Sequence, residues 1–316
     1  MILKPLVAVG VPVYNGEKYL EKCLESIHNQ SYDNWECVIV NNQSTDNSLA
    51  IAKKMCTHDS RFKVLTNTEF VDMTTNFNNT YRYASKEAKY FKVVCADDWI
   101  FPEFIEQMVN LMEEFPDAGI CSSYRIDNTK VRNDDLNIND GPVFKGYEIL
   151  MDQLKNKYDI TGSETTVLYR MEILKKLRGE SVVLYDYSSY HFDTSLAYEI
   201  LNISDLGFIF QVLSYTRRHE STLTSTTSFR FQTSLNFRES ELYKYKQLNK
   251  FLEQDYIKVR EEYGLFLVKC FLKNDRKCLQ WHREHLPKER GFKLVESVLI
   301  VLKVLWQKIF RKRKLV

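Results

Sequence analysis

Apolar runs alternate with helix-like patterns along the first third of the chain. Val7–Val13 is a short apolar run, and in the following segment, Glu17–Gln30, apolar residues recur at helical spacing. Further strand-like runs are Trp35–Val40, Phe62–Leu65 and Tyr90–Cys95, and further helix-like segments are Ser48–Met55, Asn76–Glu87 and Phe104–Phe115. The alternation predicts βαβ units and an α/β fold with a mostly parallel central sheet flanked by helices. In such sheets ligands bind beyond the carboxyl ends of the strands.

The rest of the chain divides by composition. Its middle part is less regular, and its predicted elements are strands at Gly119–Tyr124, Thr165–Tyr169 and Phe208–Thr216 and a helix at Thr194–Leu201. From about residue 229 the pattern becomes helical and strongly charged. We therefore predict one α/β domain over residues 1–227 and a helical extension over residues 228–316.

The overall composition is that of an ordinary globular protein. The 316 residues are 44% apolar and 27% charged, which excludes disordered and fibrous classes. The seven cysteines are odd in number and contain no C-x-x-C pair, so neither a disulfide framework nor a zinc site is predicted. The first residues lack the charged and apolar regions of a signal peptide. We therefore expect a cytoplasmic protein.

Charge is concentrated near the C-terminus. Residues 288–316 hold nine Lys and Arg against two Glu, a net +7, so the formal +2 of the whole chain leaves −5 for the remainder. Leu294–Phe310 carries a stripe of apolar residues and is followed by the basic run Arg311–Lys314. This pattern is typical of a helix that lies on the inner, anionic face of a cell membrane, and it favours membrane over nucleic acid. Packing against the rest of the protein or against a second subunit in a homo-oligomer is the alternative.

Two adjacent carboxylates, Asp97-Asp98, follow the last strand-like run of the first third. At the mouth of a parallel sheet they could bind Mg²⁺ or Mn²⁺ together with a diphosphate. An arbitrary Asp-Asp pair more often caps a helix, here the one that begins near Pro102. The pair alone does not decide between these two interpretations.

Four sequence blocks, in this order and spacing, resemble family 2 glycosyltransferases of the GT-A fold. The blocks are Val9–Asn15, Leu20–Ile27 with Gln30, Val38–Ser48, and Cys95–Asp98 with Pro102. The resemblance implies a nucleotide-sugar-binding part over about residues 1–118 and an acceptor part with the catalytic base over about residues 119–227. It is firm to about residue 115 and absent beyond about residue 225.

In this family the turn after the first strand cradles the donor nucleotide. The resemblance places Pro12, Tyr14, Asn15 and Glu17 there, with the Tyr14 ring or hydroxyl facing the base. Without the resemblance, Tyr14 and Asn15 would be interpreted as turn residues, and Asn15 would be expected to cap the helix that begins near Glu17.

The second block departs from the family pattern, which usually has Asp-Asp where this chain has Asn41-Asn42. In relatives one of these carboxylates recognises the base, typically uracil. An amide offers both a donor and an acceptor, so Asn41 or Asn42 could still pair with the imide edge of uracil or thymine. The departure leaves the identity of the base open.

The resemblance assigns metal and diphosphate binding to the carboxylate pair. Asp98 would be the direct ligand of a divalent cation, Mn²⁺ or Mg²⁺, and Asp97 would lie nearer the ribose or sugar. Relatives also carry an Arg-x-His segment that closes over the diphosphate, which here resembles Arg217-Arg218-His219. His219 would complete the metal shell and Arg217 or Arg218 would bind a phosphate. A surface role for His219 is the alternative.

A catalytic base must come from another part of the chain, because the metal-binding carboxylates are already occupied. In inverting relatives it is an Asp ahead of a helix, commonly in a Glu-Asp pair, and this chain has Phe192-Asp193 at that place. Asp193 is the candidate, with Asp186 in reserve. The simpler interpretation of Asp193 is a helix N-cap.

The predicted function is transfer of a sugar from a nucleotide-diphosphate sugar, with UDP as the expected nucleotide, to a hydroxyl of a glycan or lipid-linked acceptor. We expect the reaction to be inverting and metal-dependent, and to serve polysaccharide assembly at the membrane. The alternative is a non-catalytic nucleotide-sugar-binding or assembly protein on the same fold. The sequence disfavours a dinucleotide-binding dehydrogenase, because no G-x-G-x-x-G follows the first strand.

Overall fold

The chain forms two compact units in the computed structural model. The structure describes residues 4–133, 136, 138–155, 160, 163–179, 181–185, 191–218 and 233–284. The first unit comprises Met1–Tyr187 and Phe192–Arg218, and the second comprises Ser188–His191 and His219–Val316. The predicted domain boundary at residues 227/228 lies outside the described residues and stays a prediction.

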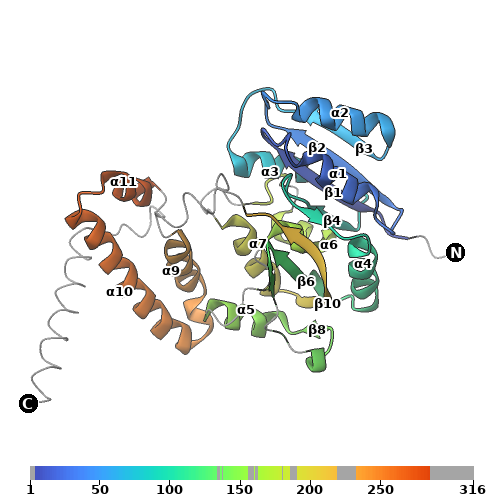
Figure 1. Cartoon of the computed structure of the whole chain (residues 1–316). Helices are drawn as coiled ribbons and strands as arrows, with labels where there is room; N and C mark the ends of the chain where they lie inside the picture. Colours follow the sequence, from blue (N-terminus) through green and yellow to red (C-terminus); the bar gives the residue numbers. More distant parts are fainter. Residues whose placement is uncertain are drawn as a thin grey trace, which may run out of the picture. The chain divides into compact units, whose positions relative to one another are not determined.

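A single mixed sheet is the centre of the first unit (Figure 1). Its described strands are β1 (Val7–Val13), β2 (Trp35–Asn41), β3 (Phe62–Thr66), β4 (Tyr90–Val93), β5 (Trp99–Ile100), β6 (Ala118–Asp127), β7 (Lys130–Arg132), β8 (Val143–Phe144), β9 (Leu168–Arg170) and β10 (Asp205–Thr216). They follow the order β3-β2-β1-β4-β9-β6-β10-β5, with β7 on β6 and β8 on β10. The longer strands pair in parallel, namely β3-β2-β1-β4 and β6-β10, while the short strands β5, β7, β8 and β9 pair antiparallel. The predicted α/β fold is confirmed.

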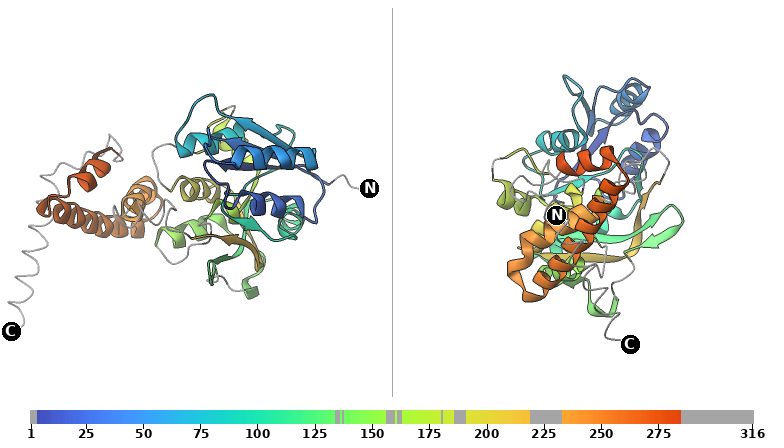
Figure 2. Two further views of the ribbon diagram at one scale, coloured as in Figure 1. Left: turned by 45° about the horizontal axis from the view of Figure 1, so that its top comes forward. Right: turned by 90° about the vertical axis from the view of Figure 1, so that its left-hand side faces the viewer.

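Helices cover both faces of this sheet (Figure 2). Those of the first unit are α1 (Leu20–His28), α2 (Ser48–His58), α3 (Met73–Arg82), α4 (Phe104–Glu114), α5 (Gly146–Leu154), α6 (Met171–Arg178) and α7 (Phe192–Leu201). Alternate residues of a strand point to opposite faces. The odd-numbered valines of β1 pack in one buried cluster with α1 and α4, whereas Gly10 faces α3.

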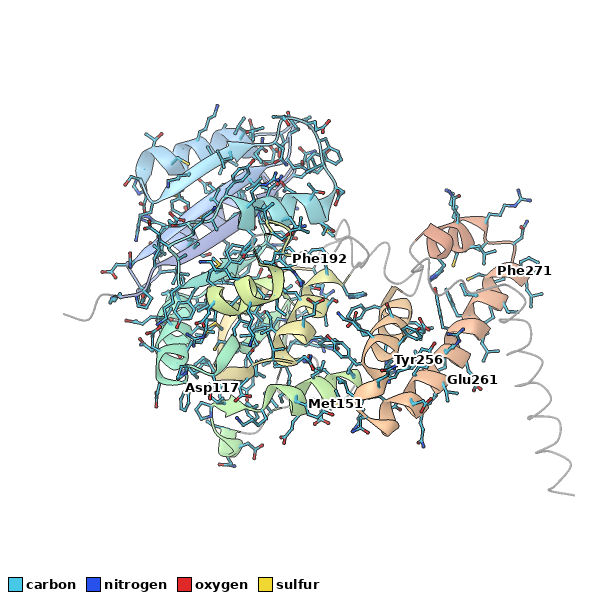
Figure 3. The ribbon with its side chains drawn as sticks, turned by 180° about the vertical axis from the view of Figure 1, so that it is seen from behind. Asp117, Met151, Phe192, Tyr256, Glu261 and Phe271 are labelled. Carbon is cyan, nitrogen blue, oxygen red and sulfur yellow. The ribbon has the colours of Figure 1, made fainter. Side chains whose placement is uncertain are left out.

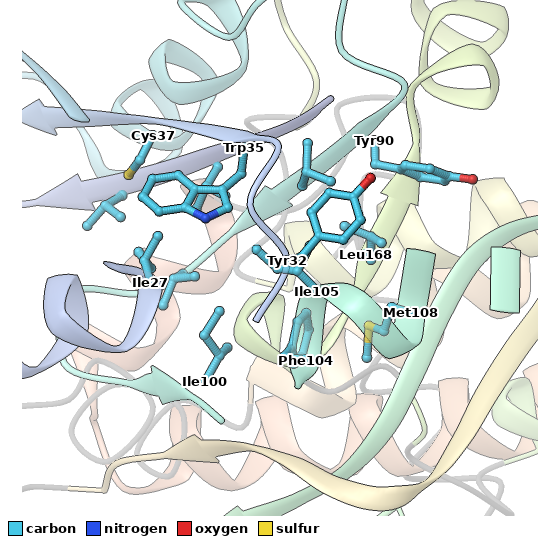
Figure 4. Packing of buried hydrophobic residues seen from close by; sticks show 14 of the residues in the cluster. Ile27, Tyr32, Trp35, Cys37, Tyr90, Ile100, Phe104, Ile105, Met108 and Leu168 are labelled. Atoms are coloured by element: carbon cyan, nitrogen blue, oxygen red, sulfur yellow. The ribbon is translucent and has the colours of Figure 1, made fainter. Parts of the chain in front are cut away.

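The buried cluster explains why these segments fold as they do (Figure 4). In α1 the apolar residues Leu20, Cys23, Leu24 and Ile27 are spaced to form one face, and all four are buried. They pack with Trp35 and with residues of α4 in the same cluster. On the other face of β1, a Cβ added to Gly10 would lie 2.5 Å from Thr80 Cβ, so glycine permits the close approach of α3.

Three predicted boundaries were wrong. The first helix begins at Leu20, not near Glu17, because residues 17–19 form a turn. Helix α3 begins at Met73, earlier than predicted, because the Asp72 side chain accepts a hydrogen bond from Thr75 N–H and caps it. The strand predicted at Thr165–Tyr169 is instead a 3-10 turn at Glu164–Thr166 followed by β9.

The second unit is helical over its described residues, as the sequence predicts. It contains α9 (Thr233–Tyr245), α10 (Lys250–Leu272) and α11 (Arg276–Glu284), and Figure 3 places Tyr256 and Phe271 on α10. The buried His282 Nδ1 lies 2.7 Å from the Tyr263 hydroxyl and joins α11 to α10. None of the described helices is both long and apolar enough to cross a membrane. The basic helix predicted at residues 294–310 lies outside the described residues.

Candidate functional site

The Asp97-Asp98 pair lies in the turn between β4 and β5, where three distant segments meet. Asp98 is only 3% exposed. Its Oδ2 accepts a hydrogen bond from the Thr165 hydroxyl at 2.7 Å, and its Oδ1 accepts one from the Arg217 backbone N–H at 2.8 Å. The Thr165 oxygen in turn accepts a hydrogen bond from the Cys95 N–H at 3.1 Å. Asp98 therefore has a fixed orientation.

The electrostatics of the pair favour a bound cation. Burial raises the pKa of Asp98 well above its usual value, and the neighbouring charge of Asp97 raises it further. The hydrogen bonds from Thr165 and Arg217 act in the opposite direction. A positive charge placed at the pair would relieve the repulsion between the two carboxylates.

Arg217 and Arg218 lie in different environments. Arg217 Nε donates to the Asp97 carbonyl oxygen at 3.1 Å, and its guanidinium lies 4.2 Å from the centre of the Tyr19 ring. Arg218 instead forms two short hydrogen bonds to Asp127, at 2.9 and 2.8 Å. The structure therefore brings Arg217, and not the Arg218 guanidinium, to the carboxylate pair.

The turn after β1 is tied to the turn before α2. Asn15 has a positive φ of 48°, and its Oδ1 accepts a hydrogen bond from Thr45 N–H at 2.8 Å. Glu17 Oε2 accepts from the Asn47 backbone N–H at 2.9 Å. The expectation that Asn15 caps the first helix was wrong, because that helix begins at Leu20 and Asn15 supports the neighbouring turn instead.

This turn also adjoins the carboxylate pair. A Cβ placed on Gly16 would lie 3.6 Å from the Cβ of Ala96, the residue before Asp97. Tyr14 is exposed on the turn, whereas Pro12 is buried inside β1, where it pairs with Val40. The turn that carries Tyr14, Asn15 and Glu17 thus comes close at Gly16 to the residue before the pair, whereas Pro12 is packed within the sheet.

Asn41 and Asn42 are buried at the end of β2 and bond to other parts of the protein. Asn41 Nδ2 donates to the Thr66 hydroxyl at 3.3 Å. Asn42 Oδ1 accepts from the Val71 N–H at 3.0 Å and from Asn67 Nδ2 at 2.9 Å, while Asn42 Nδ2 donates to the Val71 carbonyl at 2.8 Å. The Asn42 amide therefore fixes the segment before α3.

Asp193 lies in the first turn of α7, and its charge acts on the buried carboxyl of Glu164. Its Oδ1 accepts from the Thr194 N–H at 2.7 Å. Because α7 already begins at Phe192, Asp193 is a first-turn residue and not the N-cap. Burial raises the pKa of Glu164 to about 8, and the charge of Asp193 contributes to that rise. Glu164 precedes Thr165, whose hydroxyl donates to Asp98, so the charge of Asp193 acts on the same short turn that holds Asp98.

A buried lysine supports this turn from β4. Lys92 Nζ donates to the carbonyl oxygens of Val93 and Glu164, each at 2.8 Å. Burial lowers the pKa of Lys92 to about 7, against the opposing charge of Glu164. The Tyr169 hydroxyl donates to Glu164 Oε1 at 2.8 Å. Lys92, Glu164 and Thr165 were not predicted from the sequence, although a lysine within the apolar run Tyr90–Cys95 was a visible signal.

The described carboxylates suit a metal ion that is held partly by water and substrate better than one that is held by protein side chains alone. Within the described ranges no three His, Cys, Asp or Glu side chains form a metal-binding group. Mg²⁺ and similar ions often take one or two carboxylates, several waters and substrate phosphates. Asp97 and Asp98 are hard oxygen donors of that kind. His219 and Asp186 lie outside the described residues.

Known proteins resemble this chain both in sequence and in fold. The family model described as "Glycosyl transferase family 2" matches residues 8–178. Glycosyltransferase GlyA of Streptococcus pneumoniae serotype 4 is 36% identical over 115 residues, which are 36% of this chain and 16% of that protein. The matched segments make up 16% to 36% of three such curated relatives, so the chain corresponds to a minor part of their length.

Two solved structures have a similar fold. The TarS fragment 1-349 of S. aureus, solved with UDP-GlcNAc, has a TM-score of 0.58 and 19% identity, and the match covers 75% of this chain and 66% of that one. The mannosyltransferase PcManGT of Pyrobaculum calidifontis, solved with GDP-Man and Mn²⁺, has a TM-score of 0.59 and 15% identity, with coverages of 97% and 89%. At these identities the likeness establishes the GT-A fold alone.

Proposed function

Because the chain belongs to glycosyl transferase family 2, as its sequence blocks predicted, we propose that it transfers a sugar from a nucleotide-diphosphate sugar to a hydroxyl of a glycan or lipid-linked acceptor. The observation that carries the proposal is the Asp97-Asp98 pair, in which Asp98 is buried, with Arg217 beside it. Two carboxylates and one guanidinium at the end of a parallel strand suit a site for a diphosphate and its counter-ion.

Asp98, with His219, is the proposed ligand of a divalent cation, Mn²⁺ or Mg²⁺. When bound, such an ion neutralises negative charge on the departing nucleoside diphosphate. Thr165 and the Arg217 backbone hold the Asp98 carboxylate in one orientation, so little reorganisation is needed. Arg217 is the proposed phosphate contact. Arg218, paired with Asp127, would act indirectly by fixing the segment that follows β10.

The nucleotide would lie over the turn after β1. Tyr14, Asn15 and Glu17 border it there, Asn41 and Asn42 lie beneath its base end, and Asp97 lies toward the ribose or sugar. We propose UDP as the nucleotide, which is supported by the UDP-GlcNAc complex of the similarly folded TarS. GDP is the competing choice, because PcManGT is known with GDP-Man. Pro12 contributes to the cradle only by shaping the end of β1.

Asp193 is the proposed base of an inverting transfer. It would accept the proton of the acceptor hydroxyl as that oxygen attacks the anomeric carbon from the side opposite the diphosphate. Its partly buried place beside the Glu164 turn supports this role, because the turn also carries the Thr165 hydroxyl bound to Asp98. Asp186 is the reserve.

The acceptor is proposed to be a growing polysaccharide or a lipid-linked saccharide at the inner membrane face. The basic segment of residues 288–316 supports a peripheral contact with anionic lipid. A homo-oligomer that uses the same segment is the competing proposal. The rival function is a non-catalytic protein that binds nucleotide sugars, which the Asn41-Asn42 departure favours.

A thermal-shift screen of nucleotide sugars with and without Mn²⁺ tests the proposal. A ligand that binds only the native state stabilises it by RT ln(1 + [L]/Kd), so the melting temperature of the protein rises as the ligand concentration exceeds Kd. We expect one nucleotide sugar to stabilise the protein in Mn²⁺ and much less in EDTA. Release of nucleoside diphosphate from that ligand would then separate an enzyme from a binding protein. A screen without any stabilising nucleotide would reject the proposed donor class.

A further inference from the structure

Two large aromatic rings stand together on the surface of the first unit, one in the turn after β1 and one in the loop after β3. Tyr14 is 51% exposed and Phe70 is 60% exposed, although most large apolar side chains of this unit are buried. Their ring centres lie 4.9 Å apart at an interplanar angle of 61°, an edge-to-face arrangement. Tyr14 comes from the turn after β1 and Phe70 from the loop between β3 and α3. Such a corner leaves a ring face open to a planar ligand.

A buried amide holds the Phe70 loop in place. Asn42 is 3% exposed and bonds to both backbone groups of Val71, the residue after Phe70. Asn67 continues the network, because its Nδ2 donates to Asn42 Oδ1 and to Asn76 Oδ1, each at 2.9 Å. Phe70 is therefore exposed on a loop whose neighbours are fixed, and not on a loosely attached one.

The same contacts explain why an amide occupies position 42. The carbonyl oxygen of Asn42 accepts two hydrogen bonds, which uses both of its lone pairs. An aspartate could keep these two bonds but could not donate to the Val71 carbonyl, and two acceptors would then face each other. Asn42 also lacks a free acceptor for the imide N–H of uracil. Its geometry suits a positioning role better than direct pairing with a base.

We propose that Tyr14 and Phe70 form the stacking surface for the base of the donor nucleotide, and that Asn42 positions Phe70 for it. The inference rests on the proposed function and adds Phe70 to its donor site. Gly16 joins the Tyr14 turn to Ala96, so the surface adjoins the place proposed for the diphosphate. An aromatic face accepts any base, because every base has a π-face. The surface would therefore bind uracil and guanine nucleotides alike.

Calorimetric titration of the full chain with UDP and with GDP, each in Mn²⁺, tests the Phe70 role. Stacking losses of this kind weaken binding roughly tenfold to a hundredfold in Phe70→Ala, while Phe70→Tyr should bind like the wild type. Inorganic pyrophosphate has no base, so its affinity should stay unchanged in Phe70→Ala. Tyr83→Ala is the matched control, because Tyr83 is also an exposed aromatic residue, 47% exposed, at the other end of α3.

A double-mutant cycle tests the positioning role of Asn42. Asn42→Asp should weaken nucleotide binding in the wild-type background but cause no further loss when Phe70 is already alanine. Tighter binding of UDP by Asn42→Asp, or independent losses at the two positions, would identify residue 42 as a direct base contact and overturn its positioning role.

Two negative results have different meanings. A wild-type chain that binds neither UDP nor GDP would reject the proposed donor class and this inference with it. A wild-type chain that binds them, with Phe70→Ala equal to it, would reject the stacking surface alone.

Discussion

Replacement of Thr165 by valine removes one hydroxyl that serves two buried partners. The hydroxyl donates to Asp98 Oδ2 at 2.7 Å and accepts from the Cys95 N–H at 3.1 Å. An unpaired buried N–H costs about 1–3 kcal/mol, and a lost hydrogen bond to a charged group costs about 1.5–3 kcal/mol. Because one hydroxyl makes both bonds, the two losses do not simply add, and we expect a total of about 3 kcal/mol.

The same substitution should change how the carboxylate titrates. The Thr165 hydrogen bond lowers the pKa of Asp98, so its removal raises that pKa above the already elevated value. A proton and a divalent cation compete for the same oxygens of the Asp98 carboxylate. We therefore expect the acidic limb of the pH–rate profile to move to higher pH in Thr165→Val, and more Mn²⁺ to be needed at pH 7.

Urea unfolding and pH–rate profiles of two variants provide the assay. Thr166→Val is the matched control, because Thr166 is equally buried but contacts Ser214 at 3.3 Å instead of Asp98. It should lose about 1 kcal/mol and keep the wild-type pH profile. If Thr165→Val and Thr166→Val have the same unfolding free energy and the same profile, the hydroxyl does not support Asp98 and the reasoning is refuted.

Further predictions concern the arginines, the buried glutamate and the close helix contact. Arg217→Ala should reduce donor turnover at least tenfold, whereas Arg218→Ala should leave the affinity for nucleotide unchanged. If the two variants lose equal activity in steady-state assays, the assignment of Arg217 as the phosphate contact is contradicted. The pKa of Glu164 is raised above its unfolded value, so its contribution to stability is present below about pH 4.5 and is lost as pH rises toward 8. Glu164→Gln should reduce the fall in unfolding free energy between pH 5 and 7 by up to about 1.4 kcal/mol per pH unit, and an unchanged slope in urea titrations would show that Glu164 does not titrate there. Gly10→Ala should destabilise the fold by about 1–3 kcal/mol, because the new methyl group meets Thr80; an unchanged urea midpoint would show that α3 can move away.

Local patterns in the sequence predicted most of the first half of the fold. Leu20, Cys23, Leu24 and Ile27 reveal α1 because apolar residues at helical spacing need a core to face. Helix α3 was placed too late because its fully buried residues are polar. Thr74, Asn76, Asn78 and Thr80 are buried there. Their hydrogen bonds replace apolar contacts, and no periodicity of hydrophobic residues reveals them.

The candidate site was predictable only where its residues are adjacent in sequence. The Asp97-Asp98 pair and the Tyr14 turn belong to recognisable blocks. Thr165 is 67 positions from Asp98, and only the fold brings the two together. In the same way, the sequence could not reveal that the Asn42 amide is engaged by Val71. The base contact expected of Asn42 stays a prediction.

Divalent-cation-dependent release of nucleoside diphosphate from a nucleotide sugar tests the central claim most directly. The measurement compares the wild-type chain with Asp98→Ala and with Asp33→Ala, a control in which an exposed carboxylate paired with Lys4 is removed. We predict turnover in Mn²⁺ or Mg²⁺ by the wild type and by Asp33→Ala, and its loss in EDTA and in Asp98→Ala. Undiminished turnover by Asp98→Ala would contradict the assignment of the carboxylate pair.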